Sequence, residues 1–355
     1  MDALLSLPAV GYFLMPSVST YSTSLNFLFF YMTWSTLVLS QSSLRVEVVG
    51  TLGIRLLFFI VPSFLFLLFD TVMPSLSMGV KRQGKQALPT RTGGSKTSKA
   101  KIPKWYRVVG ISLFNILLGV GIQAGIETLF TGILHYKSAL RVTTRLPMPW
   151  SLARDVVKCL LVREVSDRPM HLSCCTAMTD ILSLQVLQYY PHRYILHARS
   201  SNLLSRGHKT YFHSITSPYA FVAHYDHPAS YILFRFIPIY LPAVFFRVHL
   251  LTYLVALSIV TLEETLACSG YTSIPGIILG GISRRQDLHS ESCGKGNYAS
   301  WGLLDWIHGT GPGSKEDVAD EAAKHQVKSR TRKAISNGKE ILKSLSGRRK
   351  SSRKS

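Results

Sequence analysis

The chain has 355 residues, of which 47% are hydrophobic and 17% are charged, and its formal net charge is +21 at pH 7. A typical soluble domain has about 25% charged residues, so this composition argues against an ordinary soluble protein. The positive charge concentrates at 81–107 and 324–355. Apart from Trp105 and Tyr106, these stretches lack aromatic residues that would stack on bases. They therefore favour a membrane surface over nucleic acid.

Cysteine usage and the N-terminus restrict the class of protein further. Five cysteines (Cys159, Cys174, Cys175, Cys268 and Cys293) contain no CxxC pair. Neither a disulfide framework nor a zinc ribbon is indicated. We also expect no cleavable signal peptide, because the N-terminus has no basic region and its apolar stretch continues into a membrane segment.

Apolar runs in the first half predict membrane-spanning helices. The runs at 25–39, 54–69 and 108–134 each approach the ~20 residues that cross a hydrocarbon core once their flanks are added. Pro62 predicts a kink, and residues 40–53 predict a short link that makes the first two runs a hairpin. We assign three regions: an N-terminal transmembrane hairpin at 1–77, a basic disordered linker at 78–107, and further transmembrane helices with a connecting segment at 108–186.

Two further apolar elements complete the predicted fold. A helix is expected at 176–190, and the run at 231–262, interrupted by Pro238 and Pro242, predicts a re-entrant hairpin. The fold class is therefore all-α: a polytopic integral membrane helical bundle with a cytosolic histidine-bearing cap from 187–230 and 268–310. The positive-inside rule places the linker, the cap and the C-terminal tail in the cytosol. The basic residues of 135–180 fit this orientation less well.

The tail at 311–355 leaves alternatives open. A basic amphipathic helix around 334–345 would attach to anionic lipid, whereas a solvated, disordered tail is equally compatible with the sequence. A nuclear or nucleic-acid role for the tail is a weaker alternative.

Histidines carry the main chemical signal. The chain has 12, and most lie between His192 and His308. They occur in the groups PHRYILH (His192, His197), GHKTYFH (His208, His213), HYDHP (His224, His227) and QDLH (His289). Neutral imidazole binds iron and zinc, and short groups on neighbouring helices can enclose one or two ions. The competing interpretation is a set of surface histidines in a histidine-rich chain.

These motifs, in order, resemble the fatty acid hydroxylase/sterol desaturase superfamily. The resemblance runs from LQYYPHR through HK with a downstream histidine, HYDHP, SGY, DLH and GNY to LLDWIHGT, which covers 187–310. It implies a helical protein of the endoplasmic reticulum membrane with a cytosolic, histidine-lined iron centre of two ions. It also implies O2 as co-substrate, a sterol or fatty-acyl lipid as substrate, and cytochrome b5 or another carrier as electron donor.

The resemblance assigns the metal ligands residue by residue. His192, His197, His208, His213 and His289 stand at ligand positions, and Asp287 is expected to orient a ligand. The chain departs from the family where Phe212, Cys268, Gln286 and Ser290 replace histidines. Glu264, Cys268 and His227 are further candidate ligands. For Glu264 the alternative is a solvated helix end or an ion pair with Arg284 or Arg285, and for Cys268 a buried apolar side chain.

Two functions therefore remain open on the sequence. One is a working membrane oxidoreductase that hydroxylates or desaturates a lipid. The other is a catalytically inactive relative that serves as a lipid-binding or scaffold membrane protein.

Overall fold

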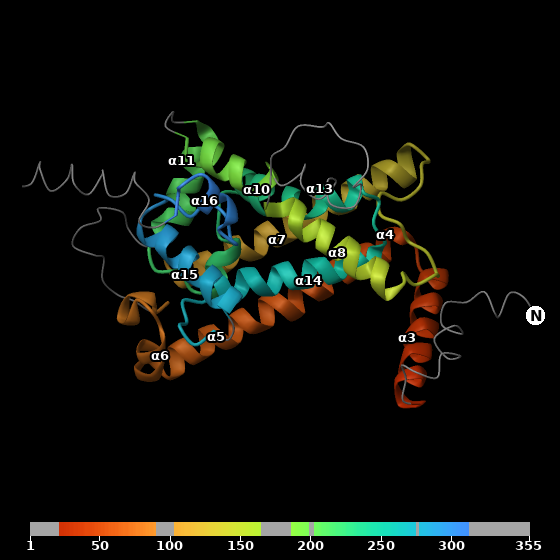
Figure 1. The fold of residues 1–355 in the computed structure, drawn as a ribbon, viewed down its shortest axis with the longest axis horizontal. Helices are drawn as coiled ribbons and strands as arrows, with labels where there is room; N and C mark the ends of the chain where they lie inside the picture. The colour runs from red at the N-terminus through yellow and green to blue at the C-terminus, as the bar shows by residue number, and fades with distance from the viewer. Residues whose placement is uncertain (1–20, 90–102, 165–185, 199–201, 275–276, 312–355) are drawn as a thin grey trace, which may run out of the picture. The chain divides into compact units, whose positions relative to one another are not determined.

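The structure is a computed structural model that describes residues 21–89, 103–164, 186–198, 202–274 and 277–311. The chain divides into two compact units, Met1–Leu304 and Asp305–Ser355. The first unit contains the helical bundle, whose described residues form helices and turns (Figure 1). In the second unit, the backbone N–H and the hydroxyl of Thr310 donate to Asp305 at 2.7 Å each.

The N-terminal helices are α3 (Tyr21–Ser40), α4 (Ser43–Arg55), the π-turn η1 (Leu56–Ile60) and α5 (Val61–Val72). The predicted link at 40–53 is wrong, because Ser42 accepts a hydrogen bond from the Arg45 N–H and starts α4 at Ser43. α4, η1 and α5 form one continuous candidate span, Ser43–Val72. The π-turn directly precedes Pro62, where the proline has no N–H for a regular helical bond.

The segment predicted as a disordered linker is ordered at its start. It contains the end of α6 (Pro74–Val80) and all of η2 (Gly84–Ala87), so the prediction is wrong for 78–89, and residues 90–102 lie outside the described part. The cause is a buried ion pair of Lys81 with Asp70. Asp70 also accepts from Ser77 Oγ at 2.5 Å and from Tyr271 OH at 2.6 Å.

The predicted span at 108–134 is confirmed as α7 (Trp105–Thr128) followed by the π-turn η3 (Leu129–Ile133). Residues 135–180, which had no assignment, contain α8 (Pro149–Glu164). Most of the helix predicted at 176–190 lies outside the described residues, and its end forms α10 (Val186–Tyr190). The short elements η4 (Pro191–Leu196), α11 (Leu203–Tyr211), η5 (Phe212–Ser214) and η6 (Ala220–His224) follow.

The run predicted as a re-entrant hairpin folds as two candidate spans. The first joins α12 (Pro228–Tyr231), η7 (Ile232–Phe236) and α13 (Ile237–Phe245), and the second is α14 (Leu250–Ala267). The break lies at 246–249 rather than at the prolines: Pro238 is in the first turn of α13, after the π-turn, and Pro242 is inside the helix. Each span has 18 residues, long enough to cross a membrane.

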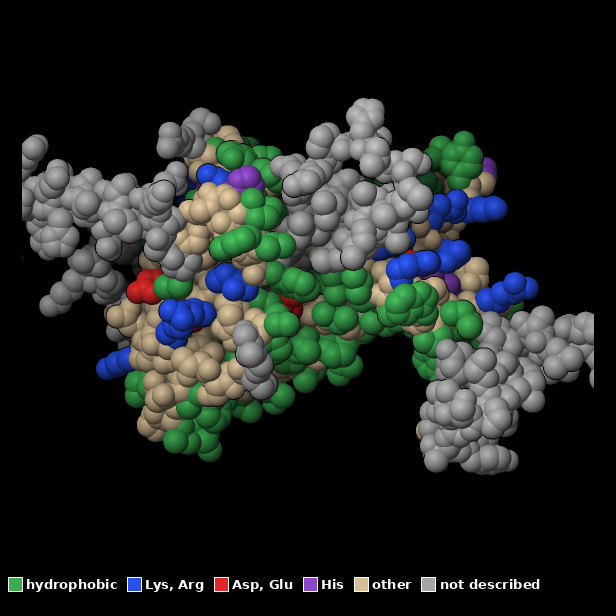
Figure 2. Space-filling view, in the orientation of Figure 1, with side chains coloured by type: hydrophobic (Ala, Val, Ile, Leu, Met, Phe, Trp, Pro, Cys, Tyr) green, Lys and Arg blue, Asp and Glu red, His purple; other side chains and the backbone are tan. Residues whose placement is uncertain are grey.

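Together, Ser43–Val72, Trp105–Ile133, Pro228–Phe245 and Leu250–Ala267 are four candidate membrane spans among the described residues. They make the chain an integral membrane protein with a helical bundle, as predicted. Figure 1 shows α4 and α5 running alongside α14, with α11 and α15 (Ile277–Glu291) toward one end of these helices. In Figure 2, hydrophobic side chains cover the edge formed by α5 and α14, while Lys and Arg lie toward the two ends of this face.

We predict that Lys81→Met alone destabilises the protein by roughly 3–5 kcal/mol, because it leaves the Asp70 carboxylate buried without its cation. The double variant Lys81→Met/Asp70→Leu should recover more than half of this loss. Denaturant unfolding of the detergent-solubilised protein measures both. Lys85→Met removes an exposed lysine from the same segment and serves as the control. Equal stabilities of the Lys81 and Lys85 variants would contradict the prediction.

Candidate metal centre

Five histidines predicted from the motifs converge in the structure. Ligand atoms of His192, His197, His208 and His289 all lie within 4.8 Å of one another. The fifth, His213, has its Nε2 3.2 Å from Nε2 of His197, and its ring centroid lies 4.9 Å from that of His208. The neighbouring segments η4, α11 and η5 and the distant helix α15 therefore place their imidazoles around one point.

Local backbone structure explains how each histidine pair reaches the same site. His192 and His197 are five residues apart, which would place them on different sides of a regular α-helix. Here the segment PHRYIL winds as a π-turn, in which the His197 N–H donates to the His192 carbonyl at 2.9 Å. In the second pair, α11 ends at Tyr211 and the tighter turn η5 brings His213 back toward His208.

Three of the imidazoles are oriented by oxygen acceptors on their Nδ1 side. Nδ1 of His192 lies 2.7 Å from the Tyr298 carbonyl, and Nδ1 of His289 lies 2.8 Å from the Gly296 carbonyl. Nδ1 of His208 lies 2.7 Å from Oδ2 of Asp226. A carbonyl or carboxylate oxygen only accepts, so each Nδ1 carries the proton and each Nε2 keeps its lone pair. This tautomer is the one that a metal ligated through Nε2 requires.

The Nε2 atoms of His192, His208 and His289 are buried and have no hydrogen-bond partner among the described residues. Nδ1 of His213 is in the same situation. Leaving a buried polar atom without a partner costs about 1–3 kcal/mol, so a group of them at one point calls for an explanation. Nitrogen lone pairs facing one another are the arrangement that fits a cation, and the residues therefore fit a metal ion.

Burial holds His192, His213 and His289 in their neutral form. It lowers the pKa of His289 to about 4, a shift that the Gly296 carbonyl opposes and that His208 and Arg235 reinforce. It likewise lowers the pKa of His192 and His213 well below 6.5, and the neighbouring histidines add to both shifts. Neutral imidazole is the ligating form, so no proton has to be removed at physiological pH.

Aromatic rings enclose the histidine group. Phe212, at a position where the family motif has a histidine, stacks on His208 with ring centroids 5.2 Å apart and an interplanar angle of 10°. The ring of Phe234, from a candidate span, lies 4.2 Å from that of His192. Tyr298 contacts His192, His197 and His289 with its ring. These aromatic rings cover part of the centre, while His197 and Tyr298 are half-buried.

The other candidate ligands lie elsewhere. Glu264 is buried with Arg235, whose Nη1 is 2.9 Å from Oε1 of Glu264, and with Arg55 at 4.0 Å. The alternative of a solvated helix end is therefore wrong, and the ion-pair partners of Glu264 include Arg235 and Arg55. His227 accepts from the Ala229 N–H as the N-cap of α12.

Cys268 packs in an apolar cluster, as its structural alternative predicted, and burial raises the pKa of its thiol to about 12. Gln286 and Ser290, which also stand where the family motif has histidines, contact each other. Nε2 of Gln286 lies 3.4 Å from Oγ of Ser290.

Asp287 was expected to orient a ligand, but its ion-pair partner is Arg82 at 3.8 Å. The carboxylate that contacts a histidine of the centre is Asp226, which the sequence analysis missed. Asp226 lies in the HYDHP motif. A carboxylate between two histidines in this motif could have indicated a residue that orients a metal ligand. The carbonyls of Tyr298 and Gly296 were missed too, and no side-chain pattern could have shown them.

Gly294 is a further residue that the sequence analysis missed. It has φ +87°, and a Cβ atom placed there would collide with the His197 ring. A side chain at this position would therefore displace His197 or the loop that carries Gly296.

Comparison with known proteins supports the motif-based assignment. Residues 178–310 match the family model described as Fatty acid hydroxylase. This range contains all five histidines, Asp226 and the 294–298 loop. No solved structure matches the chain.

We predict that Asp226→Asn weakens metal binding about 10–100-fold, because the neutral amide raises the basicity of His208 less than the carboxylate does. Chelator competition, with metal retained on the protein read by mass spectrometry, measures the affinity. Asp155→Asn makes the same change in the ion pair with Arg154 on α8 and is the control. Equal affinities of the two variants would show that Asp226 does not support a ligand.

We also predict that Gly294→Ala lowers metal occupancy severely, because the new methyl group meets His197 in addition to imposing an unfavourable φ. Gly84→Ala is the matched control: it has φ +50°, and the nearest atom to its Cβ would be a backbone oxygen at 3.6 Å. Metal content and melting temperature of both variants separate the two effects. If both variants lose stability equally and both retain metal, the contact between residue 294 and His197 has no role in metal binding.

Proposed function

Residues 178–310 belong to the fatty acid hydroxylase/sterol desaturase superfamily, and from this premise we propose that the protein is a membrane-bound, non-haem iron oxidoreductase. It would use O2 to hydroxylate or desaturate a sterol or a fatty-acyl lipid. The observation that carries the proposal is the set of buried, partnerless Nε2 atoms of His192, His208 and His289, which converge with His197 and His213.

Five histidines of this chain would bind the ion. His192, His208 and His289 present Nε2 lone pairs, and their Nδ1–H groups donate to fixed oxygen acceptors. His197 and His213 lie beside them as further ligands. Bound iron would supply the capacity to reduce O2 and to attack an unactivated C–H bond. Phe212, Phe234 and Tyr298 contact these histidines and would limit the access of water, which would protect a strong oxidant from side reactions.

The position of the centre favours a lipid substrate. Phe234 belongs to the candidate span Pro228–Phe245, and its ring contacts His192 directly. An acyl chain or sterol that approaches along this span would therefore reach the metal without crossing a solvated surface. A polar substrate would find few hydrogen-bond partners among the aromatic rings that surround the centre.

Further parts of the proposal rest on the family alone. We propose that iron occupies the centre, as two ions if the protein is active, and that cytochrome b5 or another reduced carrier supplies electrons. We further propose that the protein resides in the endoplasmic reticulum with the histidine centre and the C-terminal tail facing the cytosol. No nucleic acid is proposed as a partner.

A second candidate function, a catalytically inactive lipid-binding or scaffold protein, is favoured by Phe212. Its phenyl ring stacks on His208, at a position where the family motif has a histidine, and it cannot bind a metal. Five imidazoles suffice for one ion and leave fewer ligands for a second. Metal content together with the oxidised lipid products therefore distinguishes the two functions.

We predict near-stoichiometric iron, or more, in protein purified in detergent from iron-supplied cells. His192→Ala and His208→Ala should each remove most of it, because each deletes a buried ligand. His308→Ala, an exposed histidine of the same family region, is the control and should retain iron. Mass spectrometry of the metal content and of the cellular lipids provides the two readouts.

The outcomes separate the two functions. Iron together with an oxidised lipid that is absent from the His192 variant supports the oxidoreductase. Folded wild-type protein without iron, and cellular lipids that do not differ between wild type and variant, would establish the inactive relative.

A further inference from the structure

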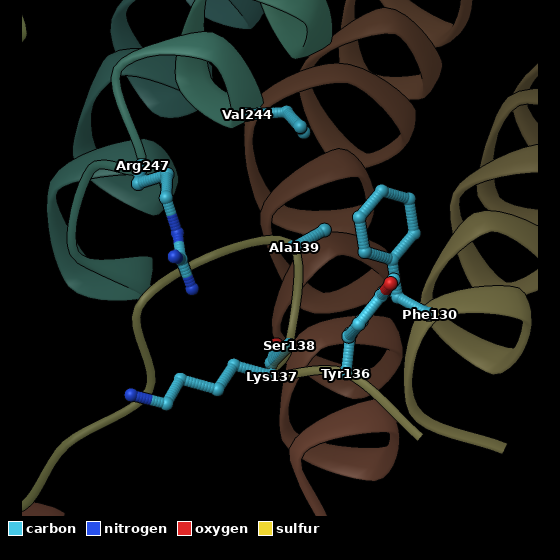
Figure 3. Close-up of a pocket in the computed structure, with 7 residues that line it drawn as sticks. All are labelled: Phe130, Tyr136, Lys137, Ser138, Ala139, Val244 and Arg247. Carbon is cyan, nitrogen blue, oxygen red and sulfur yellow. The ribbon is translucent and has the colours of Figure 1, made fainter. Parts of the chain in front are cut away.

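A pocket lies at the loop that follows η3. It has a volume of about 500 Å³ and is lined by Phe130, Tyr136, Lys137, Ser138, Ala139, Val244 and Arg247 (Figure 3). Two candidate spans end beside it, because Phe130 and Val244 lie in their last turns. If these helices cross the membrane, the pocket is at the membrane boundary.

The walls of this pocket are fixed by backbone hydrogen bonds. Arg141 N donates to the Val248 carbonyl, and Leu250 N donates to the Arg141 carbonyl, each at 3.0 Å. The Ala139 N–H donates to Oε2 of Glu127, also at 3.0 Å. These bonds join the loop to the turn between α13 and α14, so the pocket is preformed rather than a gap between unattached segments.

The lining is cationic. It contains Lys137 and Arg247 and no carboxylate among its seven residues. In Figure 3 these two side chains lie on one side of the pocket, and Phe130 and Tyr136 lie on the other. The Ser138 hydroxyl is buried and has no hydrogen-bond partner among the described residues. Two cations and a hydroxyl are the groups that recognise an oxyanion such as phosphate.

The backbone at Arg247 points to a role for its side chain. Its φ is +45°, and it follows the C-cap of α13, Phe246, at the position where glycine is the favoured residue. The Arg247 N–H donates to the Val244 carbonyl at 3.0 Å, which fixes this conformation. Arginine here costs free energy relative to glycine. The side chain is exposed, so packing in the core does not explain that cost.

This pocket is far from the metal centre. Arg107, near the start of α7, lines another pocket together with Thr210, Tyr211 and Ser214, in the segment that carries His208 and His213. Phe130 lies at the other end of the same helical rod. At about 1.5 Å per residue, 107 and 130 are roughly 35 Å apart along the axis. The metal centre therefore gives no account of Lys137 and Arg247.

The surroundings favour a lipid over a free anion. Ile133, Tyr136 and Phe245 beside the pocket are 68%, 68% and 66% exposed. On the ends of membrane spans, these side chains would contact acyl chains, while the cations reach the headgroup. A phosphate ion alone would leave this apolar surface unused.

We propose that this pocket binds the phosphate group of an anionic glycerophospholipid, with Lys137, Arg247 and the Ser138 hydroxyl as its polar contacts. The chemistry of recognition is that of any phosphate, and the lipid source is assigned from the apolar surface beside the cations. The site is independent of the proposed oxidoreductase activity.

Binding to the full-length protein in an uncharged detergent tests the proposal. We expect wild-type protein to bind dioctanoyl phosphatidic acid at least about tenfold more tightly than dioctanoyl phosphatidylcholine or inorganic phosphate. Lys137→Gln/Arg247→Gly should weaken phosphatidic acid binding by about tenfold or more. Lys104→Gln/Arg107→Gln removes the same charge near the metal centre and should change binding less than about twofold.

Arg247→Gly alone separates binding from folding, because glycine relieves the backbone cost. The melting temperature should stay equal or rise while phosphatidic acid binding weakens. Equal binding by both double variants would overturn the proposal, and inorganic phosphate binding as tightly as the lipid would overturn the lipid source. A lower melting temperature of Arg247→Gly would overturn the assignment of Arg247 to the ligand.

Discussion

Burying several imidazoles at one point is the constraint on which the rest of this structure depends. Each ring has two nitrogens, and each nitrogen needs a partner once water is removed. For His192, His208 and His289 one nitrogen is satisfied by Tyr298, Asp226 and Gly296. The remaining nitrogens face one another, an arrangement that is unfavourable without a cation. The loop at 292–302 and the segment after η6 therefore serve the centre by supplying oxygen acceptors.

The membrane imposes a related constraint on the helices. Apart from Arg45 and Arg107, which are exposed near the starts of two spans, the charged groups within the candidate spans are buried, where they contact other polar groups. Arg55 and Arg235 lie against Glu264, and Gln123 donates to Glu47 at 2.7 Å. The outward-facing positions of α5 are apolar, including Phe64, Leu65 and Leu68. Pairing the charges inside leaves the lipid-facing surface hydrophobic.

Local patterns misled where a tertiary contact changed the outcome. The basic, glycine-containing stretch after Met78 predicted disorder, yet Lys81 pairs with Asp70 and orders the chain to Pro89. Pro238 and Pro242 predicted a break, but a π-turn before α13 allows the helix to continue through both. Asp287 stands beside His289 in sequence, and its side chain nevertheless faces Arg82. For Asp287 the deciding partner is distant along the chain, whereas Lys81 and Asp70 are 11 residues apart and the π-turn is a local feature of the backbone.

The sequence by itself determined the fold class, the span at 108–134, the family resemblance of residues 187–310 and the five histidines that converge. Hydrophobic run length and motif order are properties of the chain itself, so the amino-acid sequence alone shows them. Only the tertiary structure decided that Asp226 supports His208, that Gly294 lies against His197 and that Glu264 pairs with Arg235. These facts depend on which helix faces which, and that is fixed by packing between segments that no spacing in the sequence relates.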